Sequence, residues 1–133
     1  MEEKKKKIFI VEDNKLNLKL FKDILESHNI ETAYTKNGFE ALSLIKKEKP
    51  DIILMDIQLQ GISGFDIIKQ VKSDDEIKDI PIIAVTAFAM KDDEQKILDI
   101  GCAEYISKPI FINPFLATID KYLKDDIQVN STK

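Results

Sequence analysis

The feature that most constrains this chain is a fivefold alternation between short strand-like runs and segments with helical spacing. Parallel strands that are covered on both faces read as continuous apolar runs, and Ile52–Met55 is the clearest of these. The alternation predicts an α/β fold with a five-stranded parallel sheet and helices on both faces. The predicted strands are Ile8–Glu12, Glu31–Thr35, Ile52–Met55, Ile82–Thr86 and Ala103–Ser107.

The helical segments between these runs have recognisable faces and ends. The first helical segment is 14–27, and its predicted core stripe consists of Leu20, Phe21, Ile24 and Leu25. The second segment follows Asn37–Gly38. The remaining three span 64–72, 91–100 and the region after Asn113. Gly101 is expected to close the fourth helix, and Asn113 is expected to cap the last one with Pro114 at its first position.

Composition excludes several classes of protein. A net charge of -4 argues against a nucleic-acid-binding domain, and the single cysteine, Cys102, rules out an internal disulfide framework. No apolar run approaches the roughly 20 residues that would span a bilayer. We therefore expect a cytoplasmic protein that neither binds nucleic acid nor inserts into a membrane.

Chemically active side chains follow the predicted strands. Ligands of open α/β sheets bind beyond the carboxyl ends of the strands, so these residues are expected to meet at one edge. Glu12 and Asp13 follow the first strand and Asp56 the third, whereas Thr86 ends the fourth and Lys108 follows the fifth.

Three neighbouring carboxylates repel one another, by roughly 4 kcal/mol per pair at 4 Å and an effective dielectric of 20. A hard divalent cation such as Mg²⁺ relieves this repulsion, because it prefers oxygen ligands. An aspartate can also attack phosphorus to form an aspartyl phosphate, which would need a cation and a hydroxyl nearby. Asp56, with Lys108 and Thr86, fits this description.

Four motifs together resemble the receiver domain of two-component response regulators, the CheY-like family. They are VEDN, ILMDIQL, AVTA and YISKPI, within a resemblance that covers about Lys6 to Leu123. The resemblance implies the strand order 2-1-3-4-5, a receiver domain at 1–124 and a polar, disordered tail at 125–133.

The resemblance also implies roles for single residues. Asp56 would be the phosphoacceptor, and Mg²⁺, or Mn²⁺ in its place, would be its cofactor. The metal ligands would be Asp13, Asp56, the Gln58 backbone carbonyl and, through water, Glu12. Thr86 and Lys108 would bind the phosphoryl oxygens.

Further consequences of the resemblance concern the residues around this site. Tyr105 would change orientation together with Thr86 on phosphorylation, and the Lys108–Pro109 bond would be cis. The chain departs from the family at Gln60, where proline is common. Because proline restricts φ, Gln60 is expected to loosen this loop.

The expected function is that of a single-domain response regulator, not an enzyme beyond promoting its own phosphorylation and dephosphorylation. A sensor histidine kinase or histidine phosphotransferase would donate the phosphoryl group, and output would be binding to a downstream protein, as a monomer or a weak phosphorylation-dependent dimer. The donor would dock near Asn14 and Leu18, and the output face would include Lys91, Glu104, Tyr105 and Phe115.

Three alternatives remain open. A haloacid dehalogenase-type phosphatase also uses an Asp nucleophile, but it needs a second carboxylate where Gln58 stands. A flavodoxin-like carrier needs a phosphate-binding loop, whereas the segment after the first strand is acidic. A phosphorylation-independent receiver scaffold would not need the intact set of site residues.

Overall fold

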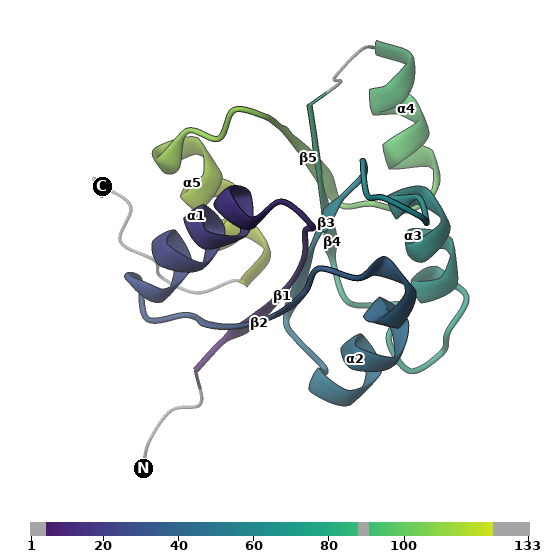
Figure 1. Ribbon diagram of the computed structural model, residues 1–133, viewed down its shortest axis with the longest axis horizontal. Helices are drawn as coiled ribbons and strands as arrows, with labels where there is room; N and C mark the ends of the chain where they lie inside the picture. The colour runs from purple at the N-terminus through teal and green to yellow at the C-terminus, as the bar shows by residue number, and fades with distance from the viewer. Residues whose placement is uncertain (1–4, 88–90, 124–133) are drawn as a thin grey trace.

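The computed structural model describes residues 5–87 and 91–123, in which strands and helices alternate as predicted (Figure 1). The strands are β1 (Lys7–Val11), β2 (Glu31–Thr35), β3 (Ile52–Asp56), β4 (Ile82–Thr86) and β5 (Glu104–Ser107). The helices are α1 (Lys15–Glu26), α2 (Ala41–Glu48), α3 (Gly64–Lys72), α4 (Lys91–Asp99) and α5 (Ile112–Leu123), with a 3-10 turn, η1, at Gly38–Glu40.

The strands form one parallel sheet in the order β2-β1-β3-β4-β5, which confirms the predicted fold. The central strand, β3, pairs with β1 and β4, and Asp56 lies opposite Val85 of β4. Because all strands run the same way, the residues that follow β1, β3, β4 and β5 gather at one edge of the sheet.

Helices cover both faces of the sheet (Figure 1). One core cluster joins Ile8, Ile10 and Leu54 to α1 and α5, and the other joins Phe9 and Met55 to α2, α3 and α4. Successive strand residues serve opposite clusters because side chains alternate across a pleated strand. Every residue of β3 is buried, so this strand is a rigid support for Asp56 at its end.

Two details of the predicted helices were wrong. In α1 the core stripe includes Leu18 instead of Leu20, which is 38% exposed. Residues 18, 21 and 25 recur at the three- and four-residue spacing of one helical face, whereas residue 20 turns away from it. α5 begins at Ile112, so Asn113 and Pro114 lie inside its first turn, where proline is tolerated.

Two glycines fix how helices meet the sheet. A Cβ on Gly64 would lie 2.5 Å from the Asp56 carbonyl oxygen, so glycine lets α3 begin directly against the end of β3. Gly101 has a φ of +109° and is separated from the end of α4 by Ile100, as predicted for a residue that closes a helix.

The described residues contain no helix long and apolar enough to cross a membrane. The predicted tail, 125–133, lies outside the described part of the chain.

Candidate functional site

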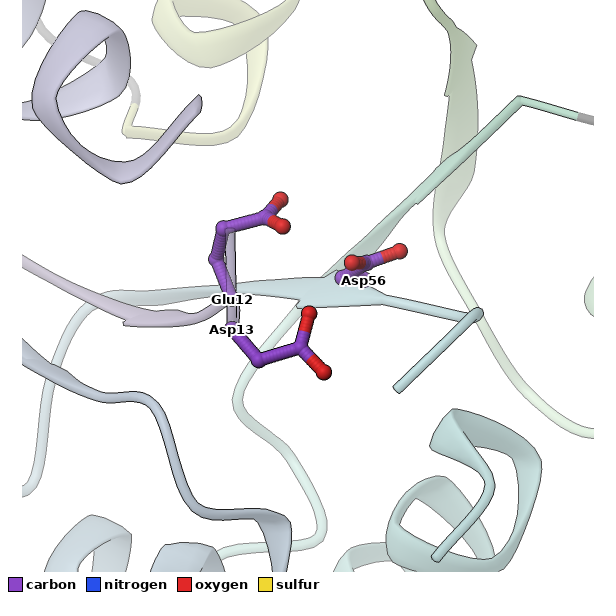
Figure 2. Close-up of side chains that lie close together, drawn as sticks. All are labelled: Glu12, Asp13 and Asp56. Atoms are coloured by element: carbon purple, nitrogen blue, oxygen red, sulfur yellow. The ribbon is translucent and has the colours of Figure 1, made fainter. Parts of the chain in front are cut away.

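Three carboxylates converge beyond the ends of β1 and β3 (Figure 2). Glu12, Asp13 and Asp56 each offer an oxygen within 4.8 Å of the others. Glu12 and Asp56 are 1% and 3% exposed, whereas Asp13 is half-buried. The predicted meeting of these side chains is therefore present in the fold.

The Glu12 carboxylate lies in an environment that disfavours its charged form. Burial, followed by hydrogen bonding and charge repulsion from Asp56, raises its pKa to about 7. Lys108 and the Asn14 backbone N–H oppose this shift, and the latter donates to Glu12 Oε2 over 3.2 Å. Among the described residues, Glu12 Oε1 is the one buried side-chain polar atom without a hydrogen-bond partner. This edge of the sheet therefore holds more negative charge than its neighbours neutralise.

Asp56 is held between its own loop and Lys108. Its Oδ1 accepts a hydrogen bond of 3.0 Å from the Gln58 backbone N–H, and its Oδ2 lies 3.6 Å from Lys108 Nζ. The same ammonium lies 3.5 Å from Glu12 Oε1. Lys108 is positioned by a 2.9 Å bond from its N–H to the Thr86 carbonyl, and its peptide bond to Pro109 is cis, as expected.

Asp13 is fixed by the loop that follows β3. The Gln60 backbone N–H donates to Asp13 Oδ2 over 2.9 Å. Proline has no N–H, so the departure from the family at this position supplies a hydrogen bond that proline could not make. The loop after β3 is therefore hydrogen-bonded to the acidic cluster at Gln60, the residue at which the sequence predicted a more flexible loop.

The side chain of Gln58 forms contacts that the sequence did not predict. Its Nε2 donates to Thr86 Oγ1 over 2.8 Å, and its Oε1 accepts from the Ala87 backbone N–H over 3.1 Å. Thr86 is 1% exposed at the end of β4. From the sequence, only the Gln58 backbone carbonyl was predicted to act, as a metal ligand. The position of Gln58 two residues after Asp56 was the only sequence feature that could have indicated a role for its side chain.

The donor set fits a hard divalent cation. It consists of carboxylate oxygens, and one of these, Glu12 Oε1, is buried without a hydrogen bond. Mg²⁺ and Mn²⁺ favour such oxygen ligands, and Mg²⁺ needs only one or two carboxylates besides waters. The acidic pocket is thus compatible with Mg²⁺.

The residues proposed for partner surfaces are only partly exposed. Leu18 and Phe115 are 6% and 1% exposed and belong to the core cluster beneath α1 and α5, so their expected place on binding faces was wrong. Both lie on the inward stripe of their helix, which packs against the sheet. Asn14 caps α1 by accepting from the Asn17 N–H over 3.0 Å. The Lys91 side chain lies outside the described part of the structure.

Tyr105 and Glu104 lie on β5 and are half-buried. A hydrogen bond to Glu94 is the largest of the effects that raise the Tyr105 pKa, which links β5 to α4. Glu104 Oε1 accepts from Lys121 Nζ over 3.0 Å and from the Tyr122 hydroxyl over 2.9 Å, which links β5 to α5. Tyr105 and Glu104 therefore connect β5 to α4 and to α5, respectively.

A parallel sheet of this strand order, with an acidic cluster at the carboxyl ends of its strands, is typical of receiver domains, and comparison with known proteins gives the same class. Residues 8–120 match the response regulator receiver domain, and the chain belongs to that family. It is 55% identical over 120 residues to the polar-differentiation response regulator DivK of Brucella anthropi, over 90% of this chain and 98% of that protein. The motifs TAFAMK and GCAEYISKPI also predict similarity to DivK.

Two solved structures show the same fold. A response regulator from Chloroflexus aurantiacus aligns with a TM-score of 0.86 and 25% identity, over 92% of this chain and all of that one. The phosphorylated cyanobacterial phytochrome response regulator RcpA aligns with a TM-score of 0.78 and 27% identity, over 90% and 95% of the two chains. The chain is thus a response regulator of the DivK and CheY kind, and a phosphoacceptor role fits its site.

Proposed function

We propose that this chain works as a single-domain response regulator in which Asp56 accepts a phosphoryl group. One observation carries the proposal: Asp56, 3% exposed at the end of the central strand, lies beside two other carboxylates and 3.6 Å from Lys108. Burying an aspartate in an acidic cluster lowers the stability of the folded protein. Such an arrangement is typical of a functional site, here one that binds a cation and accepts a phosphoryl group.

In the phosphoryl step, an Asp56 carboxylate oxygen forms a bond to phosphorus as the bond between phosphorus and a donor histidine nitrogen breaks. The leaving nitrogen keeps the electron pair of that bond, and the proton on the other ring nitrogen makes the released imidazole neutral. The donor would be a sensor histidine kinase or a histidine phosphotransferase. The related response regulator RcpA has been solved in a phosphorylated form, which supports phosphorylation of this chain.

The residues around Asp56 have complementary tasks. Asp13, Asp56 and the Gln58 carbonyl would hold Mg²⁺, or Mn²⁺ in its place, with Glu12 acting through water. When bound, the cation neutralises charge on the carboxylates and on the phosphoryl oxygens. Lys108 would form an ion pair with one phosphoryl oxygen, and the Thr86 hydroxyl would donate to another.

The signal would leave the site through Thr86 and Tyr105. Tyr105 is hydrogen-bonded to Glu94 of α4, so a change in Tyr105 orientation would alter the surface beside that helix. We infer output by binding to a downstream protein in the cytoplasm, by a monomer or a weak phosphorylation-dependent dimer. Phosphorylation and dephosphorylation of Asp56 would be the only reactions that the chain promotes.

The direct test is incubation with acetyl phosphate and Mg²⁺, followed by intact-mass measurement. Wild type should gain one phosphoryl group and Asp56→Asn none. Asp75→Asn is the matched control, because the Asp75 side chain is 93% exposed and is not part of the acidic cluster. Equal labelling of Asp56→Asn and wild type would refute the assignment.

A further inference from the structure

The Gln58 side chain bridges the two loops that flank the phosphoacceptor. It leaves the loop after β3 and reaches Thr86 and Ala87, which lie 28 and 29 residues further along the chain. The Ala87 N–H can only donate, so the atom facing it must be the carboxamide oxygen, and the NH₂ group therefore faces Thr86. Both ends of the carboxamide are thus used in one defined orientation.

Gln58 also holds the phosphoacceptor through its main chain. Its backbone N–H donates to Asp56 Oδ1 over 3.0 Å, while its side chain engages Thr86 Oγ1 over 2.8 Å. One residue therefore joins the reacting carboxylate to the hydroxyl at the end of the neighbouring strand. Movement of Thr86 away from its resting position would break at least one of these contacts.

The Ala87 N–H cannot serve Gln58 and a phosphoryl oxygen at full strength at the same time. A backbone N–H has one proton, and here Gln58 Oε1 accepts it over 3.1 Å. A phosphoryl oxygen on Asp56 that recruits this amide must displace the Gln58 carboxamide.

We propose that the Gln58 side chain is a clamp: a positioning residue that holds Thr86 and the start of the β4–α4 connection in the resting state and is displaced on phosphorylation. The clamp rests on the proposed function of Asp56. It slows phosphorylation and restrains the unphosphorylated protein from sampling the signalling arrangement, because the hydrogen bond between Gln58 Oε1 and the Ala87 N–H must break before that N–H can bind a phosphoryl oxygen.

The test compares Gln58→Met with Gln60→Met. Methionine keeps the length and flexibility of glutamine but forms neither clamp bond, and the Gln58 carbonyl and N–H remain. Gln60 lies in the same loop and contacts Asp13 only through its backbone N–H among the interactions of the described residues, so its replacement is the matched control. Melting temperatures show whether both variants are folded.

Two measurements are made on each protein. Hydrogen exchange of the Ala87 amide, followed by NMR without phosphodonor, should be about fivefold or more faster in Gln58→Met than in wild type or Gln60→Met, the factor that one lost hydrogen bond of about 1 kcal/mol implies. The rate of phosphorylation by acetyl phosphate with Mg²⁺ should rise by a similar factor in Gln58→Met alone.

The outcomes separate the clamp from the proposed function. Equal Ala87 exchange in wild type and Gln58→Met overturns the clamp. Faster exchange with an unchanged phosphorylation rate shows that the contact exists but does not restrain the reaction, which also overturns the proposal. Absence of phosphorylation in every protein, wild type included, overturns the proposed function of Asp56, whereas the exchange result still reports on the Gln58 contact itself.

Discussion

The two ends of β1 carry charge clusters that differ in kind. At its start, Lys7 Nζ lies 2.8 Å from Glu48 Oε1 and 3.8 Å from Glu31, and the Lys7 N–H donates to Asp51 over 2.8 Å. Beyond its end, Glu12 is buried beside another carboxylate, with one oxygen lacking a hydrogen bond. Lys5, Lys6 and Lys49 line the same surface pocket as the Lys7 cluster, so four lysines there accompany Glu31, Glu48 and Asp51. Beyond the end of β1, three carboxylates are accompanied by Lys108, so this second cluster has excess negative charge.

The pKa directions express the same difference. A hydrogen bond from Lys7 lowers the pKa of Glu48, whereas burial raises the pKa of Glu12 to about 7. The cluster at the start of β1 therefore stabilises the folded protein as it stands. The cluster beyond its end is stable only to the extent that the surrounding core supports it, which is typical of a site kept for chemistry.

The largest effect should come from removing the lysine at each end. Lys108→Met leaves two buried carboxylates without their neighbouring cation and should lower the metal-free free energy of unfolding by about 3 kcal/mol at pH 8. Lys7→Met removes a partly exposed ion pair and should cost less than about 1 kcal/mol. Urea unfolding in EDTA measures both, and a larger loss for Lys7→Met would contradict the contrast.

Neutralising one glutamate at each end should change stability in opposite directions. Glu12→Gln should stabilise the metal-free protein at pH 8 by up to about 3 kcal/mol, the equivalent of its pKa shift. Glu48→Gln should destabilise it by less than about 1 kcal/mol. Unfolding curves of the two variants and wild type in EDTA test this, and destabilisation by Glu12→Gln would show that Glu12 is a structural partner.

The pH dependence sharpens this comparison. Between pH 4.5 and 7 folded Glu12 holds a proton that the unfolded chain releases, so the folded state is favoured increasingly as pH falls through this window. The advantage of Glu12→Gln should therefore be greatest above pH 7 and disappear near pH 4.5. The contribution of Glu48 has the opposite sign: it is present above pH 4.5 and lost as pH falls below it. Unfolding at pH 5, 6.5 and 8 follows the Glu12 contribution, and a further measurement at pH 3.5 follows the Glu48 contribution.

Much of this arrangement could be predicted from the sequence. Periodicity identified the strands, and the rule that ligands bind beyond parallel strands brought Asp13, Asp56 and Lys108 to one edge. The sequence could not tell which carboxylate would be most strained, because that depends on burial and on the Asn14 and Lys108 contacts of Glu12.

The side-chain bridge from Gln58 was also beyond sequence reasoning. It depends on two loops that are distant in the chain and meet only because β3 and β4 are neighbours. The wrong placement of Leu18 and Phe115 had a simpler cause: an apolar residue on a helix can serve a core or a partner, and only packing distinguishes the two.

A somewhat smaller effect should come from Mg²⁺. Mg²⁺ should stabilise wild type by about 2.7 kcal/mol at 100 times its dissociation constant, while leaving the cluster around Lys7 unaffected. Asp13→Asn should lose most of this gain, although the asparagine oxygen can still accept from the Gln60 N–H. Melting curves of both proteins with Mg²⁺ and with EDTA measure this difference. Equal stabilisation of wild type and Asp13→Asn by Mg²⁺ would show that Asp13 is not a metal ligand.

The central claim is that Asp56 itself carries the phosphoryl group. Borohydride reduces an aspartyl phosphate to homoserine, so treatment of the phosphorylated protein followed by peptide mass spectrometry reads the site directly. Homoserine is expected at position 56 and at no other aspartate. Homoserine at Asp13 or elsewhere, or a phosphoryl group found on His28, would contradict it.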